Sequence, residues 1–324
     1  MRIMFWGGAS ALMGLALITA VGCGSDFESD ETPGATGGSA GSAGSGGAAG
    51  STAGSSGEAG AAGQAGAAGQ AGAAGESGAA GAAGAPNPIV NVVLRAKTDS
   101  YPHSDGLASQ TAENVTAGVR SLELIDESGE HWTLFDEAPN ATVVGYNDGD
   151  VTPLAQFPAE DAKPGHYVMG RMVQDWSRFE VLASLNEMTN SVEGVLRVLQ
   201  VTSEGAIIDG TPMEAGYFEH EFEAPGMLES YDGTLTLPDY SKTAEAEAYI
   251  ENGAWAVYFP VDVTVVAGEA ATIDVEVNMD HAFRWTDVTG LGNKDGVYDF
   301  APPLYEPVQQ FGGNRFRVSW IPAP

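Results

Sequence analysis

Cysteine is almost absent from this chain of 324 residues, which has one, and basic residues are scarce, with 13 Lys and Arg against 44 Asp and Glu. A single cysteine excludes an intramolecular disulfide. A formal net charge of −31 disfavours nucleic acid and anionic lipid head groups as partners. The histidines show no zinc-site spacing, and no G-x-S-x-G nucleophile motif lies in the folded part. We therefore expect no enzyme and assign no catalytic residue.

The one cysteine follows the only long uncharged apolar run of the chain. Met1 to Gly22 have the layout of an export signal, with Arg2 before the apolar stretch and a small-residue step before Cys23. This layout resembles a bacterial lipobox, which implies that Cys23 is acylated and anchors the chain in a membrane. Gly24 follows instead of Asp, which favours an outer-membrane or cell-surface location. The alternatives are a plain signal peptide with an incidental cysteine and a membrane-spanning helix, and the run is short and Gly-rich for the latter.

Residues 23–86 are dominated by Gly, Ala and Ser. Such a segment cannot bury enough apolar surface to offset its conformational entropy, so we expect a disordered tether with a reach of roughly 40 to 45 Å. Glycine recurs at every third position from Gly54 to Gly84, as a collagen triple helix requires. The triplets lack the proline that such a helix also needs, so the flexible linker is favoured over a trimer.

The remaining residues, 87–324, read as an all-β domain. Short segments rich in β-branched and aromatic residues recur throughout, and several alternate apolar with polar residues, which is typical of a half-buried antiparallel strand. They lie at 89–94, 119–125, 131–135, 166–173, 179–185, 192–201, 217–223, 234–237, 254–266, 272–279 and 315–320. We expect an antiparallel β-sandwich, or two small sandwich subdomains divided near 203–215. The best helical candidates are 242–251 and, for one turn, 153–157.

Two stretches resemble an uncharacterised family of bacterial lipoproteins. Phe259 to Ile273 is similar to that family's strand–Ala-Gly-Glu–strand hairpin, and Lys163 to Gly170 to its Pro-Gly-x-Tyr turn. The resemblance implies a transthyretin-like or immunoglobulin-like sandwich. A Gly/Ala/Ser tether behind a lipobox is also similar to surface lipoproteins of myxobacteria. The family has no activity to transfer, so the resemblance implies a fold and a location only.

The acidic residues offer three candidate metal sites, and the strongest lies near the C-terminus. The segment 292–299 resembles the latter half of a calcium loop, in which alternate oxygen ligands surround the ion. Its ligands would be Asp287, Asn293, Asp295 and Asp299, although Leu291 stands at the usual first position. An ordinary turn at Asp295-Gly296 explains the same residues without metal. Two weaker candidates are the turn 147–150 and the row Glu219, Glu221 and Glu223, for which a plain loop and a solvated strand face are the alternatives.

Trp285 is the tryptophan that we consider most open to a ligand, because it stands just before this acidic loop. The most favoured function is a lipid-anchored surface protein with a non-catalytic binding or structural domain, whose partner would be a surface glycan or a protein. The alternatives are a calcium-dependent carbohydrate-binding module and a hydrolase that uses two carboxylates.

Overall fold

The computed structural model describes residues 87–187, 190–288, 296–300 and 306–324. The predicted signal, Cys23 and the tether lie outside the described residues, as do Asn293 and Asp295. Within the described ranges no helix has the length and apolar character needed to cross a membrane.

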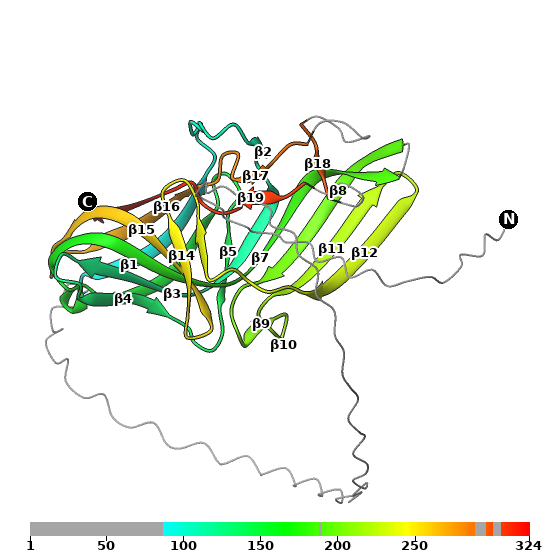
Figure 1. Ribbon diagram of the computed structural model, residues 1–324. Helices are drawn as coiled ribbons and strands as arrows, with labels where there is room; N and C mark the ends of the chain where they lie inside the picture. The colour runs from blue at the N-terminus through cyan, green and yellow to red at the C-terminus, as the bar shows by residue number, and fades with distance from the viewer. Residues whose placement is uncertain (1–86, 188–189, 289–295, 301–305) are drawn as a thin grey trace, which may run out of the picture. The chain divides into compact units, whose positions relative to one another are not determined.

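The described chain is an all-β sandwich, as predicted (Figure 1). The larger sheet has β7 (Gly165–Glu187) at its centre, because this long strand pairs with β15 (Ala254–Val265) in its first half and with β8 (Asn190–Val201) in its second. Outside β8 lie β11 (Tyr217–Ala224) and β12 (Met227–Thr234), and outside β15 lie β14 (Glu247–Glu251) and β13 (Tyr240–Lys242). The other edge of β7 pairs with β3 (Glu113–Asp126), which also holds β4 (His131–Asp136) and β5 (Thr142–Gly145).

A second sheet of four strands has the order β20-β16-β1-β6. Its strands are β20 (Arg315–Pro322), β16 (Ala271–Asn278), β1 (Ile89–Lys97) and β6 (Val151–Pro158). Pairing is antiparallel except between β1 and β16 and between β18 (Tyr298–Asp299) and β7. The short elements are β2 (Ala108–Gln110), β9 (Ala206–Ile208), β10 (Thr211–Met213), β17 (Phe283–Trp285), β19 (Val308–Gln310) and the 3₁₀ turn Ala159–Asp161.

Alternation of apolar and polar residues explains why the two sheets pack together. In β1 the side chains of Val90, Val92 and Leu94 are buried, while the residues between them are partly exposed. These side chains join a single apolar cluster that also takes in Leu124 of β3 and Phe259 of β15. Burial of one face from each sheet is the main source of stability in such a sandwich. The segment 203–215, where a second subdomain was considered, contains the hairpin β9–β10.

The hairpin predicted around residues 267–270 is wrong. The two flanking strands exist, but β15 belongs to the larger sheet, whereas β16 pairs with β1 and β20 in the smaller one. The connection therefore carries the chain across the core from one sheet to the other. Both strands alternate because each buries one face against the opposite layer, and this pattern does not distinguish a hairpin from a crossing between sheets.

Both helical predictions are wrong as well. Residues 153–157 lie in β6, and residues 242–251 cover the last residue of β13, the turn and all of β14. The predicted strand at 234–237 is displaced, since β12 ends at Thr234. The two strands predicted between 166 and 185 form the continuous strand β7.

Candidate functional site

A cavity of about 70 Å³ lies on the inner face of the larger sheet. Side chains from β3, β7, β8 and the strands β13 to β15 line one side, and the end of β16 with residues 311–316 lines the other. The hairpin β13–β14 thus forms one wall of the cavity.

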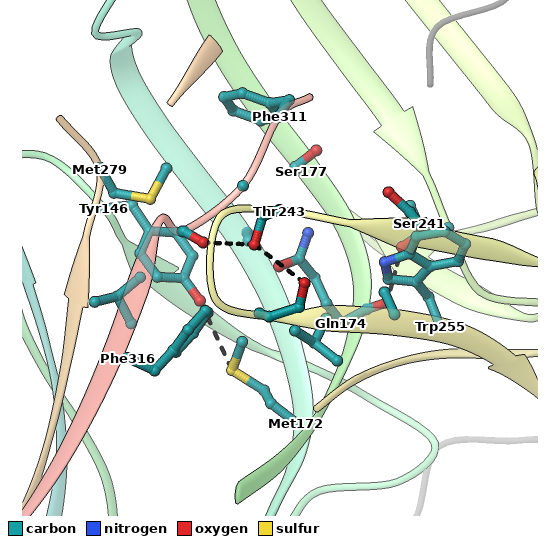
Figure 2. A pocket seen from close by; sticks show the side chains of 18 of the residues that line it. Tyr146, Met172, Gln174, Ser177, Ser241, Thr243, Trp255, Met279, Phe311 and Phe316 are labelled. Carbon is teal, nitrogen blue, oxygen red and sulfur yellow. Dashed lines mark hydrogen bonds between the residues drawn. The ribbon is translucent and has the colours of Figure 1, made fainter. Parts of the chain in front are cut away.

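Most of the lining is apolar. Figure 2 shows Tyr146, Met172, Met279 and Phe316 gathered on one side of the cavity and Trp255 on the other. Val115, Val257 and two alanines of β14 and its preceding turn complete this surface. A mostly apolar cavity with a few polar groups is the usual form of a small-molecule site.

The polar groups of the cavity come from adjacent strands. Ser177 of β7 stands opposite Gln200 of β8 on one side and opposite the apolar Ala117 of β3 on the other. All three residues line the cavity. Gln200 is 2 % exposed, and its Nε2 atom has no hydrogen-bond partner among the described residues. Buried amide groups are nearly always hydrogen-bonded in folded proteins, so a buried donor without a partner requires an explanation.

Two further hydroxyl groups face the same space. Ser241 of β13 is buried and lines the cavity. The Tyr146 hydroxyl donates to the sulfur of Met172 at 3.8 Å, which is a weak acceptor. Burial raises the pKa of the Tyr146 hydroxyl, so it stays a neutral donor.

Sequence reasoning missed this cavity. One signal was present: in β8 the inward positions are Leu196, Val198 and Gln200, so a glutamine continues an apolar row. The other lining residues come from strands far apart in the sequence, and the hairpin β13–β14 was predicted as a helix.

The candidate calcium centre is partly described: of its proposed ligands, Asp299 is buried and Asp287 is partly exposed. Asp299 is fully buried and accepts a hydrogen bond from the Ser184 hydroxyl, to which Ser191 in turn donates at 2.9 Å. Asp287 accepts a hydrogen bond from the backbone N–H of Gly296 at 3.0 Å.

Glu306, which sequence reasoning missed, joins these two acids. Its carboxylate oxygens accept hydrogen bonds from the backbone N–H groups of Val288 (2.6 Å) and Asp299 (2.9 Å). Burial raises the pKa of Glu306 to about 7, and the charge of Asp299 and a hydrogen bond to Asp287 act in the same direction. Glu306 therefore connects the backbone before and after residues 289–295.

Calcium at this centre stays a prediction. Asn293 and Asp295 lie outside the described residues. In the ranges that the structure covers, no three Asp, Glu, His or Cys side chains are arranged to hold a metal ion. Both oxygens of Glu306 are already engaged by backbone N–H groups.

The prediction that Trp285 is an open ring available to a ligand is wrong. Its side chain is 0 % exposed and packs between Phe283 and Tyr298, with ring centroids at 5.7 and 5.9 Å. Its neighbour Arg284 is also buried and forms an ion pair with Asp105. The Trp285 ring therefore fills the core and is not available to a ligand.

The two weaker acidic candidates are occupied by protein groups. In the turn 147–150, Asp150 accepts hydrogen bonds from the backbone and side chain of Asn147, both at 2.9 Å. In β11, the Arg197 guanidinium lies 2.6 Å from Glu221 and 2.8 Å from Glu223. The cation that relieves repulsion along this strand face is thus an arginine.

Comparisons of the chain with protein-family models, with curated proteins and with solved structures found no match. The lipoprotein family named on sequence resemblance therefore stays a prediction.

Proposed function

We propose that this chain is a lipid-anchored protein of the outer membrane or cell surface whose β-sandwich binds a small molecule without transforming it. The observation that carries the binding role is the cavity lined by the buried Gln200, whose Nε2 has no hydrogen-bond partner in the part of the chain that the structure describes. The anchor and the location rest on the layout around Cys23.

The chemistry of the cavity favours binding over catalysis. Tyr146 and Glu247 are the titratable residues among those that line it, and burial keeps Tyr146 neutral. General acid–base catalysis needs titratable groups placed at the reacting atoms. Among the described histidines, the ring nitrogens that form hydrogen bonds contact carboxylates or a backbone carbonyl, and no ring contacts a serine or threonine hydroxyl. His220 is buried, which lowers its pKa to about 4.

Benzene tests whether a small molecule enters the cavity. A ligand that binds only the folded protein raises its stability by mass action, by about 1.4 kcal/mol at ten times the Kd. For a domain of this size we expect the Tm of the full chain in detergent to rise by about 3 to 6 °C.

Matched variants test whether benzene binds in this cavity. Ala117→Leu and Ala246→Leu each add a bulky side chain to the lining and should abolish the rise in Tm. Ala155→Leu adds the same group in β6, outside the cavity, and should leave it unchanged. No rise in the wild-type chain, or an equal rise in the two cavity variants, would show that the cavity is not a binding site.

Cys23→Ser tests the anchor separately. The wild-type chain should incorporate an alkyne-labelled fatty acid and fractionate with membranes, and the variant should do neither. An unlabelled wild-type chain in the soluble fraction would overturn the anchor, with no bearing on the cavity.

A further inference from the structure

The lining of the cavity restricts the charge of its ligand. Among the described residues that line the cavity, Glu247 is the only one with a formal charge. Its carboxylate accepts a hydrogen bond from the Tyr249 hydroxyl at 2.7 Å and lies 3.6 Å from Lys242. A charged ligand would lose its hydration without gaining a free counter-ion, which is costly. The ligand is therefore neutral.

The hydrogen-bonding groups restrict the ligand further. The Gln200 Nε2 is a donor without a partner among the described residues, and Ser177 lies opposite Gln200 across the β7–β8 pair. An acceptor on the ligand would satisfy the amide, whereas a pure hydrocarbon would leave it unsatisfied. A neutral ligand with a carbonyl or ether oxygen thus fits these donors better than a hydrocarbon of the same size.

The remaining walls and the volume set the size of the ligand. Val115, Met172, Val257 and Phe316 contribute apolar side chains to the walls. A cavity of about 70 Å³ has room for about five water molecules at roughly 10 to 15 Å³ each. That space is smaller than the pockets of roughly 300 to 1,000 Å³ that hold drug-sized ligands, so the ligand must be compact.

The hairpin β13–β14 closes one side of this space. Thr243, in the turn of the hairpin, donates from its hydroxyl to the carbonyl of Gly313 at 2.9 Å, and the backbone N–H of Glu245 donates to Asn314 at 3.0 Å. These bonds fix the wall of the cavity opposite the end of β16.

We propose that the cavity binds a neutral, compact, mostly apolar molecule with one hydrogen-bond acceptor, which points at Gln200 and Ser177. This inference rests on the proposed function and names the class of ligand. It predicts that affinity depends on the acceptor as well as on apolar contact.

Three probes of nearly equal size test the ligand class on the full chain in detergent, with binding measured by calorimetry and by ligand-observed NMR. They are cyclohexanone, methylcyclohexane and cyclohexylammonium. Cyclohexanone should bind at least tenfold more tightly than methylcyclohexane, and cyclohexylammonium should bind at least tenfold more weakly than either. Equal affinities for the ketone and the hydrocarbon would overturn the inference.

The variant Gln200→Leu tests whether the amide causes the preference for the ketone over the hydrocarbon. This variant keeps a side chain of similar volume and should reverse the order, so that methylcyclohexane binds at least as tightly as cyclohexanone. Gln156→Leu is the matched control, because Gln156 is an exposed residue of β6 that bonds to Asn91 at 2.9 Å, and it should leave both affinities unchanged. Unchanged ketone affinity in Gln200→Leu would overturn the inference.

The failure of this inference is distinguishable from that of the proposed function. If benzene and methylcyclohexane bind but the ketone gains nothing, the cavity binds apolar molecules and only the ligand class is wrong. If none of the probes binds, the proposed small-molecule function is wrong as well.

Discussion

Polar side chains have different surroundings on the two faces of the strands β7, β8 and β11. On the outer face, Glu180, Arg197 and Glu221 stand opposite one another, so that each acid faces a base. Arg197 lies 3.2 Å from Glu180 and 2.6 Å from Glu221. On the inner face, Gln200 is buried, and its amide donor meets no acceptor within the described ranges.

This difference indicates that the fold requires the ion pairs of the outer face but does not require the Gln200 amide. The ion pairs of the outer face follow the ordinary rule that cross-strand neighbours carry opposite charges. A leucine at position 200 would fit the apolar inner face and would carry no amide donor that needs a hydrogen bond. Residues that break a folding rule without a structural gain are expected at functional sites, which is why the cavity is the favoured binding site.

The largest expected effect comes from placing an acid on each face in turn. Leu196→Glu introduces a carboxylate at a 0 % exposed position of the inner face, whereas Leu182→Glu introduces one at a position that is 47 % exposed. The buried charge has no partner, so the first variant should lose more than about 4 kcal/mol of unfolding free energy or fail to fold. The second should change by less than about 0.5 kcal/mol.

Urea denaturation of the two variants measures this difference. Equal losses in both variants would contradict the assignment of inner and outer faces.

The next effect concerns Glu306, a buried acid that, unlike Glu221, forms no ion pair with an arginine among the described residues. Burial raises its pKa to about 7, so the folded protein holds a proton that the unfolded chain releases above its ordinary pKa. The stabilisation is thus complete below the unfolded pKa and is lost as pH rises towards 7. Between pH 5 and 8 the wild-type chain should lose about 1 to 3 kcal/mol more than Glu306→Gln, which cannot titrate.

Denaturation at several pH values, with the two chains compared at each, isolates this group from the others. Parallel curves would show that Glu306 keeps its ordinary pKa. Calcium sharpens the test, because an ion at Asp287 and Asp299 should raise the Tm more at pH 8 than at pH 5 relative to EDTA. A Tm that calcium leaves unchanged at both pH values would remove the calcium prediction.

The smallest effect tests the outer face. Arg197→Met removes the partner of three carboxylates and should cost about 0.5 to 2 kcal/mol, because exposed ion pairs are individually weak. Arg178→Met is the control, since Arg178 forms one ion pair in the described structure, with Asp209, and also lies over the Trp176 ring; this variant should cost less than Arg197→Met. The difference should shrink in 1 M salt, and a salt-independent difference would indicate lost packing instead.

The sequence pattern predicted most of the strands because alternation is a local property. β1, β8 and β16 follow their predicted segments closely. The hairpin β13–β14 was missed because Ala244 to Ala248 alternate alanine with glutamate, and both residue types favour helices. The pattern also has the period of a strand, with Ala246 and Ala248 buried and Glu247 partly exposed, and pairing with β15 decides the outcome.

The sites were harder to predict because they depend on long-range contacts. Glu306 lies beyond the spacing of a calcium loop, and its role arises only from the backbone groups that it meets. Trp285 and its charged neighbours gave no local sign that the ring is buried. Gln200 did give a local sign, as a polar residue in an apolar row, but the cavity that gives this sign its meaning is built from distant strands.

The most direct test of the central claim is the unfolding free energy of Gln200→Leu without ligand. If the amide serves a ligand and not the fold, its replacement removes a desolvated and unpaired donor, and stability should rise by about 1 to 2 kcal/mol. The exposed control Gln156→Leu should change stability by less than about 0.5 kcal/mol. A loss of stability in Gln200→Leu would show that the amide supports the fold, and would contradict the account.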